Sequence, residues 1–518
     1  MSAEVFKPKY NPWLTCVPLM VAAFMFVLDE TIANVALPYM AGSFSVSNHE
    51  STWILTSYLI ASGIVIPSVD FFSKLMGRKN FFIMSIIIFT FASFLCGIAN
   101  SLPVMVLTRI LQGFGGGALL PLAQSITLEL FPIEKRAQSM ALFGLVVVIA
   151  PILGPVIGGW LTVNWSWPLI YFINIPIGVL AVGLAKKLIE DPPYARKQDN
   201  VKIDKVGFFL LTGWLTCMQV VLDKGNDADW FGSPMICWMT FFTVVFFICF
   251  FYSQITRKDS LIDLTVFKDA NFSLGTFVQI VMQGVLLSSM AILPQFLQGL
   301  MGYDAYLSGL AMMPRGVGAL STVVFIGTIG SKINPKILVI LGMILLGTSG
   351  MMLSFLNLEM ATINIVLPNF IMGVGMVMSM IPIITLSTMT LKNFQMTNAS
   401  GVQNLLKNLG GAIGTSLVTT IISRKAQAHQ HFLVDNLTMT NDNFIVRMQA
   451  YIANFMQNSD IITATNKAGA LIYNQMSLQS HMQAYKDAFE ICALACFSII
   501  PLLFFLKGIK KEELKEEK

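Results

Sequence analysis

LTCVPLMVAAFMFVLDETIANVAL, residues 14–37, is the stretch that decides the fold. An α-helix of this length crosses a bilayer core of about 30 Å. The apolar residues are continuous rather than alternating, which indicates a helix and not a β-strand. Two charged residues, Asp29 and Glu30, lie side by side past its middle, and no small-residue cleavage site follows. We therefore predict the first membrane helix here and not a cleaved signal peptide.

The whole composition agrees with this interpretation. The chain has 518 residues, of which 55% are hydrophobic and 12% charged, with a mean hydropathy of +0.70. Soluble proteins carry about 25% charged residues. Since helices satisfy their own backbone polar groups in lipid, we predict an all-α membrane protein. Its fourteen predicted spans lie near 14–37, 52–72, 81–99, 103–127, 137–163, 167–188, 206–223, 234–255, 272–296, 306–329, 336–356, 362–388, 400–423 and 486–507.

The basic residues give the expected orientation. Most of the 33 Lys and Arg residues fall in the loops on one side of the membrane and near the two termini. By the positive-inside rule, both termini are predicted to be cytoplasmic, in a multi-pass protein of the bacterial inner membrane. The net charge of +5 is then a signal of topology, and no nucleic-acid partner is expected.

Short sequences recur eight helices apart, which predicts two homologous halves. SKLMGRK at 73–79 follows the second span, and SKINPK at 331–336 follows the tenth. RILQG at 109–113 corresponds to NFIMG at 369–373, and Leu-Pro recurs at 37–38 and 293–294. Parallel halves with a binding site between them are a transporter design. The predicted units are 1–190, inserted helices 203–256, 270–507, and a charged cytoplasmic tail 508–518.

Segment 424–485 is polar and is predicted to lie outside the membrane, as a periplasmic amphipathic insertion. Seven of its apolar residues share one helical face: Phe444, Ile445, Met448, Tyr451, Ile452, Phe455 and Met456. Such a helix lies on the bilayer surface or caps its own outer loops; alternatively, it docks an envelope partner.

Asp29 and Glu30 are candidates for proton coupling. A charge at membrane depth costs at least about 2.5–3.5 kcal/mol, so such residues are functional candidates by default. Burial favours the protonated form of a carboxyl group. A carboxylate that exchanges a proton for a cationic substrate is antiport in its simplest form. The alternative is that one of the two acids merely faces water near the outer end of the helix.

Arg109 lies in the fourth predicted span and needs a partner, because a guanidinium stays charged. Asp29 and Glu30 are the nearest acids in depth, and protonation of a paired acid would free the helices to rearrange. The alternative is a permanent ion pair that fixes helix packing. Arg315 either attracts anionic groups, pairs with an acid of the other half, or is structural. Lys407 is expected to extend to the headgroups.

Further polar residues at membrane depth are candidates for lining a substrate cavity, although helix–helix hydrogen bonds would explain any of them. With Arg315, they are Asn34, Gln112, Gln279, Gln283, Asn369 and Asn404. The seven cysteines lie in apolar runs, so neither disulfides nor a metal site are expected.

Four motifs occur in order along the chain: LDETIANVALP at 28–38, RILQG at 109–113, GPVIGG at 154–159 and WPLIYFINIPIG at 167–178. Together they resemble the fourteen-helix EmrB/QacA-type drug:proton antiporters of the major facilitator superfamily, most closely the EmrB side. The resemblance implies a major facilitator fold with two six-helix bundles and two inserted helices. It also links Arg109 to proton coupling, and Gly154, Pro155, Gly158 and Gly159 to the antiporter motif that governs conformational change.

The resemblance has one departure and one extension. The family's loop motif GxLxDRxGRR is changed at Asp70, Phe72, Lys74 and Leu75, which puts its cytoplasmic charge latch in doubt. On the EmrB side, the segment at 424–485 accompanies a periplasmic membrane-fusion adaptor (EmrA-like) and an outer-membrane channel (TolC-like), so the resemblance favours the docking interpretation.

We therefore expect a proton-coupled multidrug efflux transporter for hydrophobic or amphipathic toxic compounds, not an enzyme, driven by the proton gradient without a cofactor. No GxxxxGK[ST] loop supports an ATP-driven pump. The four histidines, His49, His429, His431 and His481, are expected in outer loops, which disfavours a haem enzyme. The alternative is an exporter of one dedicated metabolite, such as a siderophore or lipid precursor, on the same fold.

Overall fold

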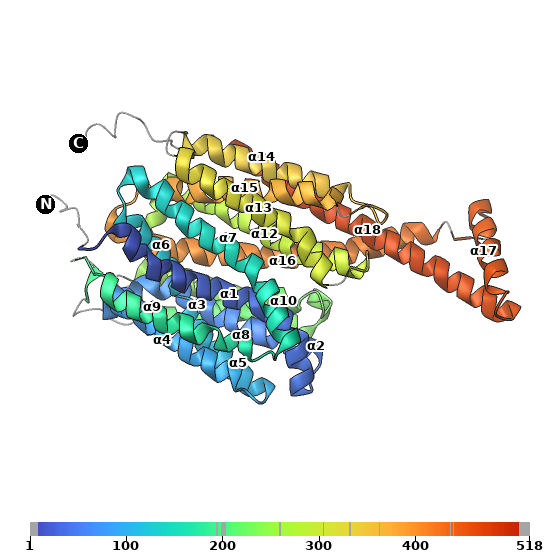
Figure 1. The fold of residues 1–518 in the computed structure, drawn as a ribbon, viewed down its shortest axis with the longest axis horizontal. Coiled ribbons are helices and arrows are strands. Elements are labelled where there is room, and N and C mark those ends of the chain that lie inside the picture. The colour runs from blue at the N-terminus through green and yellow to red at the C-terminus, as the bar shows by residue number, and fades with distance from the viewer. Residues whose placement is uncertain are drawn as a thin grey trace.

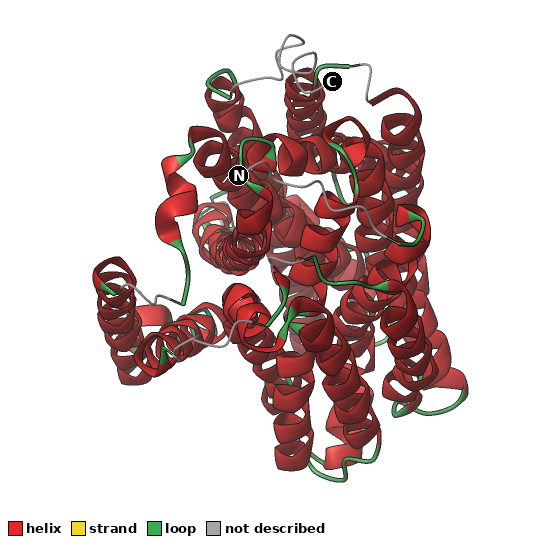
Figure 2. Cartoon of the chain, turned by 90° about the vertical axis from the view of Figure 1, so that its left-hand side faces the viewer, coloured by secondary structure: helices red, strands yellow, loops and turns green. Residues whose placement is uncertain are grey.

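All secondary structure in the described part of the chain is helical (Figures 1 and 2). This computed structural model describes residues 9–192, 195–197, 204–257, 261–303, 305–330, 333–361, 363–435, 437–438 and 440–506. Both termini lie at one end of the long bundle, which we name the terminal end; the opposite end is the distal end (Figure 1). The predicted tail 508–518 lies outside the described residues.

Nine helices, of which α2 and α8 have only four residues each, form the described part of the first half: α1 (Pro12–Phe44), α2 (Asn48–Ser51), α3 (Trp53–Met76), α4 (Arg78–Gly97), α5 (Leu102–Gly116), α6 (Leu119–Leu130), α7 (Ile133–Asn164), α8 (Leu169–Phe172) and α9 (Asn174–Leu188). Helices α10 (Lys205–Lys224) and α11 (Pro234–Thr256) follow. The second half contains α12 (Ala270–Gly299), α13 (Ala305–Ile329), α14 (Pro335–Ser354), α15 (Ile363–Thr388), α16 (Met396–Val434), α17 (Asp442–Phe455) and α18 (Ile461–Leu503).

The predicted membrane fold is confirmed, with differences in detail. Thirteen helical segments of the described chain are long and apolar enough to cross a membrane. The fourteenth predicted span, 486–507, is the last part of α18, where Lys486, Asp487 and Glu490 reduce the apolar character. Its buried face nevertheless packs into the core of the second half, against α14 and α16. The predicted span 103–127 is divided between α5 and α6 at Gly117.

In the described part of the chain, the two halves meet mainly along four helix pairs. Helix α7 packs on α13 and α15, and α16 packs on both α3 and α6. A hydrogen bond of 2.8 Å from the Asn404 amide to Gln124 Oε1 joins α16 to α6. Gly401 of α16 lies against the backbone of Ile66 in α3, where a Cβ would approach the Ile66 carbonyl to 2.9 Å. These contacts involve the part of α16 nearest its start, so they hold the halves together on the terminal side.

The inserted helices cover the seam between the halves. Helix α10 packs on α11 and also contacts both α3 and α16. Thr56 of α3 donates to Asp223 of α10 over 2.7 Å, and Ser416 of α16 donates to the Leu222 carbonyl over 2.8 Å. The buried ring of Trp214 adds apolar contact in the same cluster. The insertion therefore bridges the two halves.

Segment 424–485 differs from its expected form. Helices α16 and α18 continue past the bundle at the distal end, and α17 crosses the tip of this extension (Figure 1). No glycine or proline interrupts 424–434, so the helix continues after its apolar run ends. The expectation that the histidines lie in loops was therefore wrong for all four of them. His49 lies in the short helix α2, and His429, His431 and His481 lie in the extended α16 and α18.

The predicted apolar face of α17 is the face that packs on α18. Its residues are half-buried except for Met456, and the Tyr451 hydroxyl hydrogen-bonds to the Gln475 side chain over 3.0 Å. Since α17 stands beyond the distal end of the bundle (Figure 1), that face is covered by the protein's own chain rather than by a bilayer.

The altered loop motif still takes part in charge contacts at the terminal end. Arg78, at the start of α4, forms a buried ion pair of 2.7 Å with Glu129 near the end of α6. The backbone amide of Lys79 donates to Asp191 over 2.8 Å. Lys74 pairs instead with Asp70, one turn earlier in α3. The changed motif thus keeps a buried ion pair, which joins Arg78 of α4 to an acid of α6 within the first half.

Gly115 provides a test of this packing. A Cβ at Gly115 would lie 2.5 Å from the backbone nitrogen of Phe89 and 2.9 Å from the Ser85 carbonyl oxygen, so α5 and α4 would have to separate. We expect Gly115→Ala to destabilise the protein by about 1–3 kcal/mol. The measurement is the melting temperature of the detergent-solubilised protein. Gly183→Ala is the matched control, because nothing lies within 4 Å of its Cβ position; equal melting temperatures for the two variants would contradict the packing.

Candidate functional site

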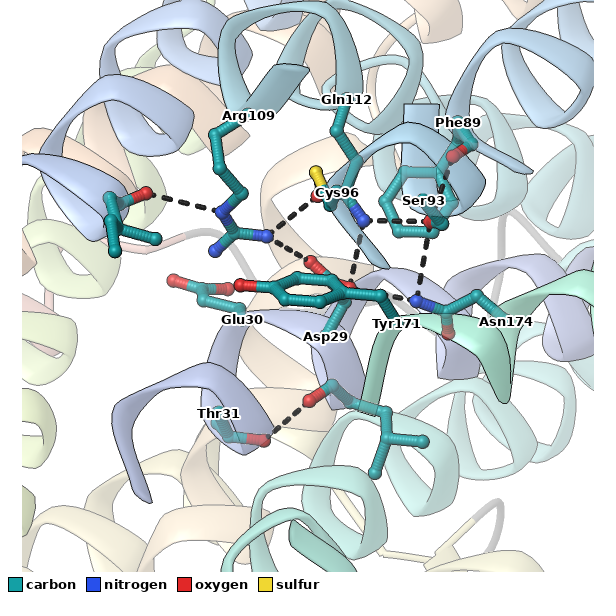
Figure 3. A network of polar contacts seen from close by, with 12 residues as sticks. Asp29, Glu30, Thr31, Phe89, Ser93, Cys96, Arg109, Gln112, Tyr171 and Asn174 are labelled. Atoms are coloured by element: carbon teal, nitrogen blue, oxygen red, sulfur yellow. Dashed lines mark hydrogen bonds and ion pairs between the residues drawn. The ribbon is translucent and has the colours of Figure 1, made fainter. Parts of the chain in front are cut away.

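Helix α1 directs its two neighbouring acids to different environments. Asp29 is fully buried, whereas the Glu30 side chain is partly accessible. Adjacent residues point about 100° apart on a helix, so α1 buries one acid in the first half and leaves the other on a more open face. Figure 3 shows the polar groups that surround Asp29.

Arg109 of α5 forms an ion pair with Asp29. Its Nη1 lies 2.7 Å from Asp29 Oδ2, and neither side chain is exposed. The same nitrogen donates to Gln112 Oε1 over 2.7 Å, and Nε donates to the Ile54 carbonyl of α3 over 3.1 Å. The ion pair therefore joins α1, α3 and α5.

Two amides complete the coordination of Asp29. Gln112 Nε2 and Asn174 Nδ2 each donate to Asp29 Oδ1 over 2.8 Å. Gln112 also donates to Ser93 Oγ over 2.8 Å, and that hydroxyl donates to the Phe89 carbonyl. The Asp29 carboxylate of α1 thus binds side chains of α5 and α9 directly, and Ser93 of α4 joins the network through Gln112 (Figure 3).

Two aromatic rings enclose the guanidinium. The Arg109 Cζ lies 4.3 Å from the ring centroid of Tyr58 and 5.5 Å from that of Tyr171. Both rings are buried, and their faces attract the cation. Arg109 Nη2 and the Tyr58 hydroxyl have no hydrogen-bond partner among the described residues.

Sequence reasoning missed Ser93, Asn174, Tyr58 and Tyr171. Asn174 carried a usable signal, because it is a polar residue near the middle of an apolar stretch, as Gln112 is. Ser93 and the tyrosines carried none, because serine and tyrosine are common in membrane helices. Their role in the site depends on the rotation of α3, α4 and α9 about their axes.

Asn34 and Glu30 share the more open face of α1. The Asn34 side chain is exposed, and its amide donates to the Glu30 carbonyl one turn earlier over 3.1 Å. The Glu30 carboxylate has no hydrogen bond or ion pair within the described chain. It is therefore the free acid next to the ion-paired one.

The antiporter-motif glycines bring α7 close to this part of α1. A Cβ at Gly154 would collide with the Thr31 side chain, and one at Gly158 would collide with Ile32. Gly159 is less tightly packed, with Val35 Cγ1 at 3.8 Å from its Cβ position. The side chain of Pro155 lies outside the described residues. Movement of α7 must therefore be transmitted to the turn of α1 that contains both acids.

The remaining candidates lie in the second half, separate from the Asp29 network. Gln279 of α12 is buried and donates to Ser387 over 3.4 Å, while Gln283 is half-buried. Arg315 of α13 donates to Asn369 of α15 over 3.0 Å.

Asn404 of α16 bonds across the seam to Gln124. Lys407 is also buried and donates to Asn404 Oδ1 over 3.3 Å, so the expectation that it extends to the headgroups was wrong.

The Asp29 carboxylate and the Arg109 guanidinium depend on each other inside the first half. As a carboxylate, it accepts three hydrogen bonds from charged or amide donors and is well satisfied. A proton on Asp29 would remove the counter-ion of Arg109, and a buried, unpaired cation is unstable. Protonation and rearrangement of the helices around Arg109 are therefore linked.

Comparison with known proteins places this geometry in a family. Residues 19–415 match the Major Facilitator Superfamily. The Escherichia coli (strain K12) protein named "Probable multidrug resistance protein EmrY" is 32% identical over 96% of this chain and 95% of its own length. "Multidrug export protein EmrB" of Haemophilus influenzae is 31% identical over 95% of each chain.

A solved structure of the proton:xylose symporter XylE matches with a TM-score of 0.59 over 97% of this chain and 98% of that chain. At 14% sequence identity, this likeness concerns the fold alone. The family match and the near full-length relatives agree with the fold described above. The chain belongs to the major facilitator superfamily, and over nearly its whole length it is similar to the multidrug resistance proteins EmrY and EmrB.

Proposed function

We propose that this protein is a proton-coupled multidrug efflux transporter of the bacterial inner membrane, which exports hydrophobic or amphipathic toxic compounds by alternating access. Similarity to EmrY and EmrB supports the export of drugs. The observation that carries proton coupling is the fully buried Asp29–Arg109 ion pair, with Glu30 accessible beside it.

In this mechanism, Glu30 receives a proton from the distal side and Asp29 is the coupling acid. Protonation of Asp29 releases Arg109, which must then find other partners among the helices that it joins. The Arg109 side chain already bonds to α3 through the Ile54 carbonyl, so its displacement shifts α3 relative to α1 and α5. Release of the proton on the other side restores the ion pair and resets the transporter.

The terminal end is proposed to face the cytoplasm, as the distribution of Lys and Arg suggests. The contacts of Gln124 with Asn404, and of Gly401 with Ile66, then close the cytoplasmic side. The accessible Glu30 and Asn34 side chains are proposed to face the outer part of the transport path. Opening on the cytoplasmic side requires these inter-half contacts to separate.

The distal extension of α16, α17 and α18 is the proposed docking element for a periplasmic membrane-fusion adaptor, which leads to an outer-membrane channel. Because the predicted face of α17 packs on α18, the docking surface must be formed by other residues. The most exposed apolar side chains of the extension are those of Phe432, Val446, Ile461 and Ile462. Exposed apolar groups of this kind mark interaction surfaces.

Proton coupling predicts the behaviour of Asp29→Asn. The variant keeps the shape of the side chain but cannot exchange a proton, so we expect no export of a fluorescent hydrophobic dye driven by a pH gradient. Inside-out vesicles with a pH-sensitive dye measure both fluxes. Substrate exchange without a gradient should persist, which shows that the protein is folded. Undiminished gradient-driven export by Asp29→Asn would refute the mechanism.

The charge balance of the ion pair predicts a second result. Asp29→Asn leaves Arg109 buried without its counter-ion, at a cost of about 3–5 kcal/mol. We expect the double variant Asp29→Asn/Arg109→Gln to regain a large part of this stability without regaining proton coupling. Melting temperatures in detergent measure the first effect, and the vesicle assay measures the second. If the double variant is less stable than Asp29→Asn, the two residues do not act as a pair.

Adaptor docking predicts that export across the whole envelope and transport across the inner membrane can be separated. Ile461→Ser/Ile462→Ser should reduce co-purification with a co-expressed membrane-fusion adaptor and abolish drug resistance in cells. Transport in vesicles should stay at the wild-type level, because these residues lie far from Asp29. Asn458→Ser, at an exposed polar position nearby, is the control. Wild-type co-purification by the isoleucine variant would exclude this surface.

A further inference from the structure

The two halves repeat the packing around their central glycines. In the first half, a Cβ at Gly113 of α5 would meet the Tyr58 carbonyl oxygen of α3. In the second half, a Cβ at Gly373 of α15 would meet the Arg315 carbonyl oxygen of α13. Arg315 therefore occupies the position that Tyr58 has in the first half.

The same correspondence places Asn369 at the position of Arg109, because each lies four residues before its glycine. The buried arginine therefore lies on α5 in the first half, whereas in the second half it lies on α13, the helix that corresponds to α3. Tyr58 and Arg109 contact each other in the first half, and Arg315 Nη2 donates to Asn369 Oδ1 over 3.0 Å in the second. Each half therefore keeps one buried guanidinium in an equivalent location.

The second half has lost the acids. Aligning Leu37-Pro38 of α1 with Leu293-Pro294 of α12 places Val285 and Leu286 at the positions of Asp29 and Glu30. Helices α12 and α15, which both pack on α13, contain no aspartate or glutamate, and α7 contains only Glu134, next to its first residue. Nothing on these three helices can neutralise Arg315 at its own depth.

Arg315 is consequently a buried cation with unused donors. It is the eleventh of the 25 residues of α13, about halfway along a membrane-spanning helix, and it is 4% exposed. Among the described residues, its Nε and Nη1 have no hydrogen-bond partner. A guanidinium cannot discharge, and its donors match the two oxygens of a carboxylate. The site is therefore complete only with an anion.

We propose that Arg315, oriented by Asn369, is an anion-binding subsite in the second half, and that the protein's substrates include amphipathic molecules with a carboxylate group. This inference rests on the proposed export function and specifies its substrate class. The cation and the proton-coupling acid then lie in different halves, so substrate charge and proton are bound at separate sites.

The competing explanation is an internal counter-ion from the first half. Glu30 is the free acid of α1, and it could pair with Arg315 when the distal side closes. In that case, Arg315 would serve conformational change and would not discriminate between substrates. Substrate charge separates the two explanations, because only an anion-binding subsite distinguishes a carboxylate from a neutral analogue.

The test uses two probes with the same skeleton, dansyl-labelled undecanoate and dansyl-labelled undecanamide. Binding to the full-length protein in zwitterionic nanodiscs is measured by fluorescence titration without a proton gradient. We expect tighter binding of the undecanoate by the wild type. Arg315→Gln should raise the Kd of the undecanoate about tenfold or more and leave that of the undecanamide within about twofold.

Two further variants serve as controls. Arg315→Lys keeps the charge without the planar fork of donors, and should retain part of the preference for the undecanoate. Lys407→Gln removes the other buried cation of the second half and should retain the preference. Unchanged binding of the undecanamide also shows that Arg315→Gln is folded.

Three results would overturn the proposal: a wild type without preference for the undecanoate, an equal loss of both probes in Arg315→Gln, or a loss of preference in Lys407→Gln alone. An equal loss that Glu30→Gln reproduces would establish the internal counter-ion instead. Because binding is measured without a gradient, failure of proton-driven export in vesicles is a separate result. That failure would refute the proposed function and leave the charge preference intact.

Discussion

The ion pair between Asp29 and Arg109 constrains the first half of this protein more than any other contact. Both charges are fully buried, and the carboxylate accepts hydrogen bonds from side chains of two other helices, α5 and α9. Removing one charge from such a pair costs far more than the pair contributes to stability. In the proposed mechanism, the helices that meet there rearrange when the charge of Asp29 changes, which is the property that a coupling site requires.

The two halves share a fold but not an electrostatic design. In the first half, a cation and an acid neutralise each other inside the protein. In the second half, Arg315 occupies the position that corresponds to Tyr58. The positions that correspond to Asp29 and Glu30 are occupied by the apolar residues Val285 and Leu286. The sequence repeat therefore predicted two halves of the same fold. It did not predict that the buried charges of the two halves would differ. In the proposed division of roles, one half exchanges a proton and the other receives a negative group.

Packing connects these charges to movement. Gly154 and Gly158 let α7 contact the turn of α1 next to Asp29 and Glu30, and α7 also packs on α13, which contains Arg315. Helix α10 bridges α3 and α16 on the other seam. The insertion is therefore part of the interface between the halves, and any opening of the terminal side must carry α10 with one half or the other.

The sequence by itself determined the membrane helices, the repeat and the depth of Asp29, Glu30 and Arg109. These properties follow from local hydropathy and spacing, and burial of long apolar runs in lipid leaves few alternatives to a helix. The sequence also predicted an apolar face on 442–455 but not its partner, since α18 covers that face only because α16 and α18 continue beyond the bundle.

Only the tertiary structure decided which acid is paired, which is accessible, and that Ser93, Asn174, Tyr58 and Tyr171 complete the site. It also decided that Lys407 is buried and that Arg78 pairs with Glu129. The physical reason is rotation: hydropathy sets where a helix lies in depth, while contacts between helices set which side chains it directs inward.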